Sequence, residues 1–335
     1  MNTRFSSSPF WSVALLVAAV FIPAQGMSQT SGGSAKHLRL GFVVSKDSPL
    51  GAFGTTLADL VKERTKGAVL VDLFDKGQLG GETEMLNSVR QGSLDLTLVG
   101  SPIVAQVEPS FGVTELPFIW KDAATMFKVL NGQTGKDLLN TLETNKLVGI
   151  AFADSGPRSV LSRSKPVEGI DDVRGLKIRV VENKLYVASW RGFGANPVPM
   201  AWTEVYTGLQ QGAIDAVDST PWGTRDAKHF EVAKYIALTN HIYTAYVLVM
   251  NIDKWRTIPA EQQQILISAA MDAQRVNRDL IEKDNKSAIE MMKTAGVKVT
   301  QPDRNKFLAK VDPVYAEFAK SINPALLKQV QDANK

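Results

Sequence analysis

The segment Gly175–Ser219, GLKIRVVENKLYVASWRGFGANPVPMAWTEVYTGLQQGAIDAVDS, guides the interpretation of the whole chain. Its first part, Leu176–Val180, has the pattern of a short strand and carries Arg179 near its carboxyl end. A short helix, a turn and a second helix closed by Gly212 follow, and Ala213–Asp218 has the pattern of another strand. In α/β folds of this kind, ligands bind beyond the carboxyl ends of the strands. Arg179 is therefore the first candidate for a ligand contact.

A second segment repeats this pattern 120 positions earlier. In both Glu84–Asp95 and Glu204–Asp215 a helix ends in Gln-Gly, followed by a small residue, Leu or Ile, and Asp. Comparable strands and helices precede each copy, which makes a chance match less credible than two similar lobes. We therefore predict two α/β lobes with a ligand cleft between them, a fold like that of periplasmic binding proteins.

The N-terminus has the features of an export signal. Arg4 precedes the apolar run Phe10–Ile22, which is shorter than the ~20 residues of a membrane span, and small residues follow it. An uncleaved anchor is the alternative interpretation. We expect a signal peptide over residues 1–26, cleavage between Gly26 and Ser31, and a mature protein in the periplasm.

The remaining periodicity indicates where each lobe begins and ends. Between Pro259 and Gly296 lie 36 residues without Gly or Pro, long enough for a helix of about 54 Å that spans both lobes. The polar stretch Lys283–Lys286 leaves two helices or a bend as the alternative. Predicted strands and helices then place lobe I at residues 38–155 plus 243–283, and lobe II at residues 156–242 plus 284–330.

Composition excludes several kinds of chemistry. The 335-residue chain has no cysteine and a net charge of only +4, with its basic residues scattered, so we expect no nucleic-acid partner. Of three histidines, we expect His37 and His229 at the surface and His241 in a structural role. No nucleophile motif, phosphate loop or metal-ligand spacing is present, so neither catalysis nor a metal or organic cofactor is implied.

Binding chemistry has better candidates. An arginine holds a carboxylate through two parallel hydrogen bonds, which suits Arg179, although a surface arginine is the competing interpretation. Arg158 follows a predicted crossing strand, where it faces the cleft or forms an ion pair within its loop. The aromatic residues beside turns, each of which is either core or pocket, are Trp202, Trp222 and Tyr243.

Four stretches together resemble the solute-binding subunits of TRAP transporters, the DctP-type family: KGQLGGETEMLNSVRQGSLDL (76–96), GLKIRV (175–180), GANPVPMAWTEVYTGLQQGAIDAVDS (194–219) and KYIALTNH (234–241). The similarity extends from about Leu38 to Tyr315. It implies a periplasmic receptor, which we expect to be a monomer, that closes around a small organic anion and delivers it to the small and large permease subunits.

The resemblance also assigns roles to single residues. It implies that Arg179 binds the substrate carboxylate, with Arg158 as a second arginine and Trp202 as the aromatic contact. Ser219 stands where the family has an asparagine, and Gly100 where sialic acid binders have a glutamate. With Asp218 suited to accept from a hydroxyl, we expect a hydroxy or keto monocarboxylate, with an aromatic group as one option. A sensing receptor and an exported enzyme are the alternative functions.

Overall fold

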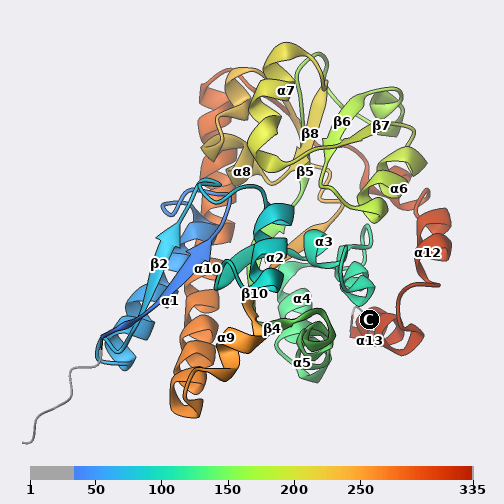
Figure 1. Cartoon of the computed structure of the whole chain (residues 1–335). Coiled ribbons are helices and arrows are strands. Elements are labelled where there is room, and N and C mark those ends of the chain that lie inside the picture. Colours follow the sequence, from blue (N-terminus) through green and yellow to red (C-terminus); the bar gives the residue numbers. More distant parts are fainter. Residues whose placement is uncertain (1–33, 334–335) are drawn as a thin grey trace, which may run out of the picture. The chain divides into compact units, whose positions relative to one another are not determined.

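The computed structural model describes residues 34–333, and within them the two predicted lobes are each built on one sheet (Figure 1). The expected signal peptide lies outside the described residues. Lobe I has a five-stranded sheet in the order β2-β1-β3-β10-β4, in which the first three strands are parallel and β10 is antiparallel to both of its neighbours. The strands are β1 (Lys36–Gly41), β2 (Val69–Phe74), β3 (Leu96–Gly100), β4 (Leu147–Pro157) and β10 (Tyr243–Asn251).

Lobe II has a six-stranded sheet in the order β11-β9-β5-β8-β6-β7. Strands β8, β6 and β7, the last three in this order, are parallel, so their carboxyl ends lie on the same side of the sheet. The strands are β5 (Ser159–Ser162), β6 (Lys177–Val180), β7 (Asn196–Pro199), β8 (Ala216–Ser219), β9 (Tyr235–Ala237) and β11 (Lys298–Thr300).

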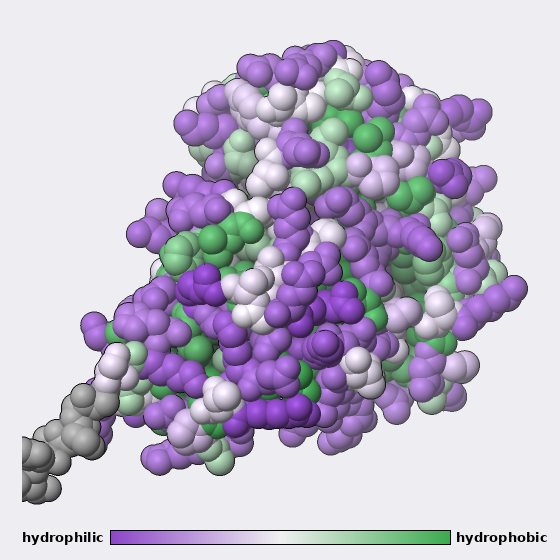
Figure 2. All heavy atoms as spheres, in the orientation of Figure 1, coloured by the Kyte–Doolittle hydropathy of each residue, from purple (hydrophilic) through white to green (hydrophobic). Residues whose placement is uncertain are grey.

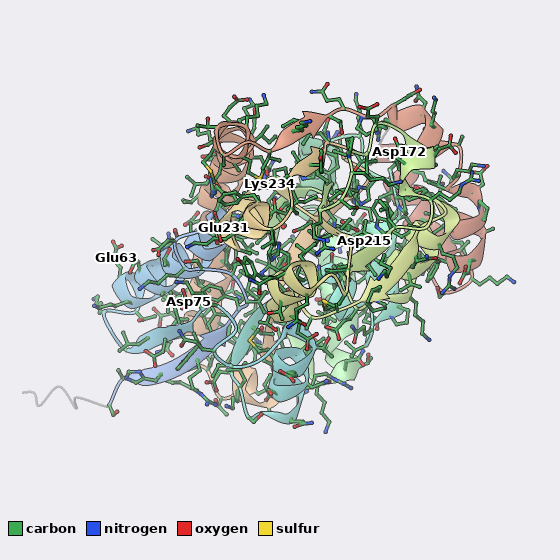
Figure 3. All side chains as sticks on the ribbon, turned by 90° about the horizontal axis from the view of Figure 1, so that it is seen from above. Glu63, Asp75, Asp172, Asp215, Glu231 and Lys234 are labelled. Carbon is green, nitrogen blue, oxygen red and sulfur yellow. The ribbon has the colours of Figure 1, made fainter. Side chains whose placement is uncertain are left out.

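The predicted internal repeat has a structural basis. Helices α2 (Glu82–Gln91) and α7 (Val205–Gln211) both end at a glycine in the left-handed region, Gly92 and Gly212, which a side chain would strain. The aspartates that follow do the same task in each lobe. A carboxylate oxygen of Asp95 accepts from Arg39 N of β1 at 2.8 Å, and one of Asp215 (labelled in Figure 3) accepts from Lys177 N of β6 at 3.0 Å. The residues common to the two segments therefore form the same helix-to-strand connection in both lobes.

Helices cover both sheets and hide their apolar side chains. In lobe I, α1 (Pro49–Arg64) begins at Ser48, whose hydroxyl accepts from Gly51 N at 3.0 Å, and buries Phe53, Leu57 and Val61. Lobe II has α6 (Lys184–Gly192), α7 and α8 (Pro221–Asp226). Figure 2 shows a mainly hydrophilic outer face with small apolar patches, and charged side chains such as Glu63 extend outward in Figure 3. No helix within residues 34–333 combines the length and hydrophobicity needed to span a bilayer.

The long helix is continuous. Helix α10 (Ala260–Thr294) has 35 residues, so the alternative of two helices is wrong. On lobe I it is held by Asn277, whose Oδ1 accepts from Asp154 N at 2.7 Å and whose Nδ2 donates to the carbonyls of Asp154 and Pro49 at 3.0 Å. The helix therefore depends on buried polar contacts as well as on its apolar stripe.

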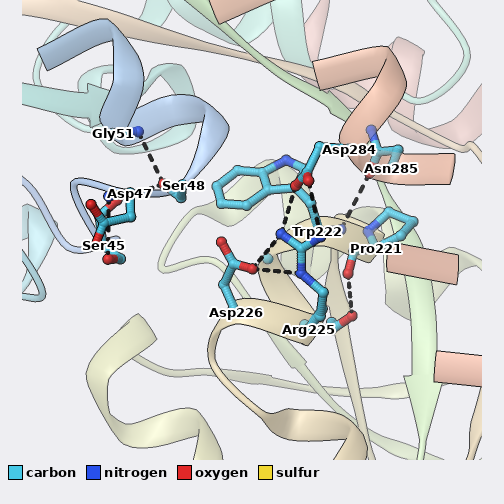
Figure 4. A network of polar contacts seen from close by, with 12 residues as sticks. Ser45, Asp47, Ser48, Gly51, Pro221, Trp222, Arg225, Asp226, Asp284 and Asn285 are labelled. Carbon is cyan, nitrogen blue, oxygen red and sulfur yellow. Dashed lines mark hydrogen bonds and ion pairs between the residues drawn. The ribbon is translucent and has the colours of Figure 1, made fainter. Parts of the chain in front are cut away.

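The polar stretch that interrupts this stripe attaches the helix to lobe II. Figure 4 shows Asn285 Oδ1 accepting from Trp222 N at 3.2 Å, and Asp284 paired with Arg225 of α8. Over this stretch of α10, polar side chains and not apolar ones make the contact with α8. This contact accounts for the interruption of the apolar stripe without a bend in the helix.

The C-terminal region is also helical. It contains two short helices, α11 (Arg304–Leu308) and α12 (Asp312–Phe318), and Pro313 lies in the first turn of α12, where a proline fits. The expected tail forms α13 (Pro324–Ala333), which packs on α4 (Ala123–Leu130) and the short helix η1 (Pro109–Glu115) of lobe I. The sequence-based boundary puts this helix in lobe II.

Replacing Asn277 by alanine should lower the free energy of unfolding by about 3 kcal/mol, because buried backbone groups lose their partners. Chemical denaturation measures the change. Asp279→Ala, at an exposed position of the same helix, is the control and should leave stability within about 0.5 kcal/mol of the parent. Equal loss in the two variants would contradict the role of Asn277.

Candidate functional site

A cavity of about 30 Å³ lies where the carboxyl ends of strands from both lobes face each other. Its walls combine basic, acidic, hydroxyl and aromatic side chains. One water molecule needs about 10–15 Å³ of such cavity volume, so the cavity holds roughly two waters. Its walls must therefore separate to admit an organic acid. The lining residues are Val44, Glu82, Ser155, Arg158, Arg179, Val181, Trp202, Ser219, Thr220, Trp222, Gly223 and Tyr246.

Arg179 is a buried cation with no carboxylate partner among the described residues. It lies on β6, is 3% exposed, and donates from Nε to the carbonyl of Met200 at 2.9 Å. Burial, followed by repulsion from Arg158, lowers the pKa of Arg179 to about 10. The guanidinium remains charged at neutral pH but is poorly compensated. A buried charge in this state is stabilised by an anion that enters the cavity.

Arg158 is also in the cavity wall but is neutralised by the protein. Its Nε donates to Asp218 Oδ1 at 2.6 Å, and a terminal nitrogen donates to the Asp218 carbonyl at 2.6 Å. Burial opposes the charge, but Asp218 outweighs it and raises the pKa of Arg158 above its usual value. Arg158 therefore faces the cavity, as one of the two interpretations had it, and its ion pair is with Asp218 of β8 and not within its own loop.

Asp218 lies behind the cavity wall rather than in it. Besides Arg158, its carboxylate accepts from Trp190 Nε1 at 2.7 Å and lies 3.3 Å from His241 Nε2. Burial would raise the pKa of Asp218, but Arg158 and His241 lower it to well below its usual value. With both oxygens engaged, this aspartate orients Arg158 and is not among the residues that line the cavity. His241 also contacts Thr239 Oγ1 at 2.7 Å, the structural role that we expected.

Two tryptophans form the aromatic side of the cavity. The Arg179 guanidinium carbon lies 5.5 Å from the centre of the Trp202 ring, a cation–π distance. Trp222 is 2% exposed, and its Nε1 donates to the Ser155 carbonyl at 2.7 Å. The indole is thus fixed across the junction of the lobes. Both residues, predicted as candidates from their positions beside turns, reach the cavity.

Ser219 and Tyr243 differ in their positions. Ser219 ends β8 and lines the cavity. Tyr243 does not line it, because it lies at the start of β10 opposite Pro157, and the strand shifts register between Thr244 and Ala245. The tyrosine that reaches the cavity is Tyr246, beyond this irregularity. The sequence contains no signal that locates such a bulge.

Glu82 is the main lining residue that sequence reasoning missed. It is the first residue of α2 and 8% exposed, and its Oε1 accepts from Gly100 N at 3.0 Å. Burial raises the pKa of Glu82, although Gly100 N and Arg179 act in the opposite direction. Its position directly after Gly80 and Gly81, in the connection that follows β2, was the available signal, since α/β sites form beyond strand ends.

The surface assignment of His229 is wrong. The ring is 1% exposed and packs edge-on against Trp202, with ring centres 4.8 Å apart. Burial, and then the nearby Arg179, lowers the pKa of His229 to about 3. The charged neighbours in the sequence suggested solvent, but the short helix η5 (His229–Glu231) turns this side chain inward. Within residues 34–333, no three acidic, histidine or cysteine side chains are grouped to hold a metal.

Comparisons with known proteins agree on one family. The profile of the family described as bacterial extracellular solute-binding protein, family 7 (DctP) matches residues 40–321. The 2,3-diketo-L-gulonate-binding periplasmic protein of Escherichia coli is 37% identical over 86% of this chain and 88% of its own. The C4-dicarboxylate-binding periplasmic protein of Rhodobacter capsulatus is 30% identical over 88% and 90%.

Solved structures give the same result. The sugar acid binding protein of Advenella mimigardefordensis, in complex with galactonate, is 29% identical with a TM-score of 0.87, covering 90% of this chain and 98% of its own. A TRAP periplasmic solute-binding protein from a Bradyrhizobium species, in complex with D-galacturonate, is 32% identical with a TM-score of 0.85, covering 89% and 100%.

The buried neutral state of His229 predicts a pH dependence of stability. Because its pKa in the folded protein is below the usual 6.5, its stabilising contribution is complete above pH 6.5 and is lost as the pH falls toward about 3. The parent should therefore lose up to about 1.4 kcal/mol per pH unit relative to His229→Gln in this window.

Denaturant unfolding at several pH values measures this difference. His37→Gln is the control, since the exposed His37 pairs only with Asp72 at the surface. Stability curves for the parent and His229→Gln that stay parallel from pH 6.5 to 4 would contradict the prediction.

Proposed function

The chain belongs to the bacterial extracellular solute-binding proteins of family 7, the binding proteins of TRAP transporters, and we propose that it captures a sugar acid in the periplasm. A cleaved signal peptide at the N-terminus would export it, and membrane permease subunits would receive the ligand from it. The observation that carries the proposal is Arg179, a buried guanidinium in the cavity that pairs with no carboxylate in the described part of the chain.

In this proposal the ligand carboxylate enters the cavity beside the Arg179 guanidinium. It pairs with Arg179 through charge-assisted hydrogen bonds, which are stronger in a buried site and have a defined geometry. Arg158 supplies a second donor, held in place by Asp218. Trp202 and Trp222 then cover the apolar face of the ligand, as aromatic rings do at cavities that bury a polyhydroxylated carbon chain.

Charge and hydrogen-bonding capacity favour a monocarboxylate with several hydroxyl or keto groups. Arg158 is paired with Asp218, so Arg179 is the arginine of the cavity wall that a ligand carboxylate can pair with. Glu82 lies nearby, but burial raises its pKa and so works against its charged form. The other polar groups of the wall are neutral hydroxyls that donate and accept: Ser155, Ser219, Thr220 and Tyr246. Relatives named for 2,3-diketo-L-gulonate and galactonate bind molecules of this class.

Enzymatic turnover is the disfavoured alternative, since a family of transport binding proteins and a wall without a nucleophile–base pair both support binding. A sensing receptor would use the same cavity. Its partner, rather than its ligand, would differ.

Arg179→Ala should weaken sugar-acid binding on the order of 100-fold or more, because truncating one partner of a buried charge pair costs several kcal/mol. Ligand-induced thermal stabilisation and then calorimetry measure the loss. Lys177→Ala, an exposed position on the same strand, should bind as the parent does. Unchanged affinity of Arg179→Ala would remove the arginine from the proposed site.

A thermal-shift panel tests the ligand class. Hexonates, hexuronates and diketogulonate should stabilise the protein more than succinate or malate, because of the two arginines in the cavity wall Arg158 is already paired with Asp218. Calorimetry on the best compounds gives their affinities. Preferential binding of a C4-dicarboxylate would refute the monocarboxylate assignment while leaving the family unchanged.

A further inference from the structure

The turn Glu182–Asn183 lies between β6, which carries Arg179, and helix α6 of lobe II. It contacts lobe I through three hydrogen bonds. Asn183 Nδ2 donates to the Pro102 carbonyl at 2.6 Å, Gln106 Nε2 donates to the Glu182 carbonyl, and Thr83 Oγ1 donates to Glu182 Oε2 at 3.4 Å. Neither residue of the turn lines the cavity.

From this arrangement we propose that the Glu182–Asn183 turn is a closure latch, which holds the two lobes together and thereby sets how fast a bound solute leaves. The inference rests on the proposed function only for the role in solute release. The latch itself consists of protein groups alone and acts on the lobes whether or not a solute is present.

The location of the turn makes it reversible. Glu182 and Asn183 are half-buried and Gln106 is exposed, and all three border a surface groove of about 1090 Å³. Water can therefore replace each hydrogen bond when the lobes separate, so no buried group is left without a partner. Buried hydrogen bonds at this place would resist opening, whereas contacts of this kind stabilise closure only modestly.

The turn also connects the latch to the ligand. Only three residues separate Arg179 from Asn183 in the chain, and Val181 between them lines the cavity. The turn is thus the continuation of the strand that carries Arg179 into the cavity. Glu182 and Asn183 are positioning residues, since they act on the solute through the distance between the lobes.

Two different atoms of the Asn183 side chain cap α6 and contact lobe I, so the two roles can be tested separately. Its Oδ1 accepts from Leu185 N at 2.7 Å and so caps α6, while its Nδ2 makes the contact with lobe I. Asn183→Asp keeps the capping oxygen, because aspartate caps helices as well as asparagine does. It also replaces the donor to Pro102 by a second oxygen, which repels that carbonyl.

A second variant tests the same contact from the other lobe. Gln106→Glu replaces the donor to the Glu182 carbonyl by an acceptor without altering α6. Lys184→Ala is the matched control, because Lys184 is the exposed first residue of α6, directly after the turn, and makes none of these contacts with lobe I.

Distance measurements between the lobes and solute release rates test the proposal. The chain has no cysteine, so Gln91→Cys on α2 and Gln210→Cys on α7 accept spin labels at two exposed positions. Electron-spin distances are recorded without solute and with D-galacturonate. Release of D-galacturonate is followed by stopped-flow fluorescence of Trp202 and Trp222, which line the cavity.

We expect longer label distances in Asn183→Asp and Gln106→Glu than in the parent and in Lys184→Ala, with release about tenfold faster. Distances and release rates equal to those of the parent in both variants would overturn the latch. If D-galacturonate does not bind the parent, its assignment as a ligand fails, and the distances without solute still decide on the latch.

Discussion

The site depends on one electrostatic constraint, which is that two guanidinium groups share a buried cavity while, within residues 34–333, only Arg158 has a carboxylate counter-ion. Asp218 compensates Arg158, and the indole of Trp190 and the ring of His241 hold that aspartate in place. Arg179 lacks such compensation and is supported by a carbonyl and the Trp202 ring. Taking a charge out of water is costly, so the fold retains Arg179 in a strained electrostatic state that an anion relieves.

The two arginines have different roles in the structure. The Arg158–Asp218 pair joins the start of β5 to the end of β8 and therefore belongs to the core of lobe II. The side chain of Arg179 instead contacts the Met200 carbonyl and the Trp202 ring. Under the proposed function, a ligand carboxylate could leave Arg179 without breaking the Arg158–Asp218 pair.

Much of the fold could be predicted from the sequence, because the deciding signals are local. The left-handed glycines Gly92 and Gly212, and the aspartates that follow them, mark equivalent connections in both lobes and need no knowledge of tertiary contacts. The long helix α10 is likewise evident from its lack of glycine and proline. Its polar stretch remained ambiguous, since only the position of α8 shows that Asp284 and Asn285 are contacts.

The site could be predicted only in part, for the same reason. Arg179, Trp202 and Ser219 lie at strand ends or turns within one continuous segment, and all three line the cavity. Glu82, Tyr246 and the burial of His229 depend on how distant elements meet, and on a register shift in β10 that leaves no mark in the composition. Helix α10 extends this logic. Asn277 fixes it to lobe I and Asn285 to lobe II, only eight residues, or about 12 Å, apart. The two attachment points are about two helical turns apart. If one lobe rotates against the other, this short part of α10 must therefore bend or twist to follow both lobes.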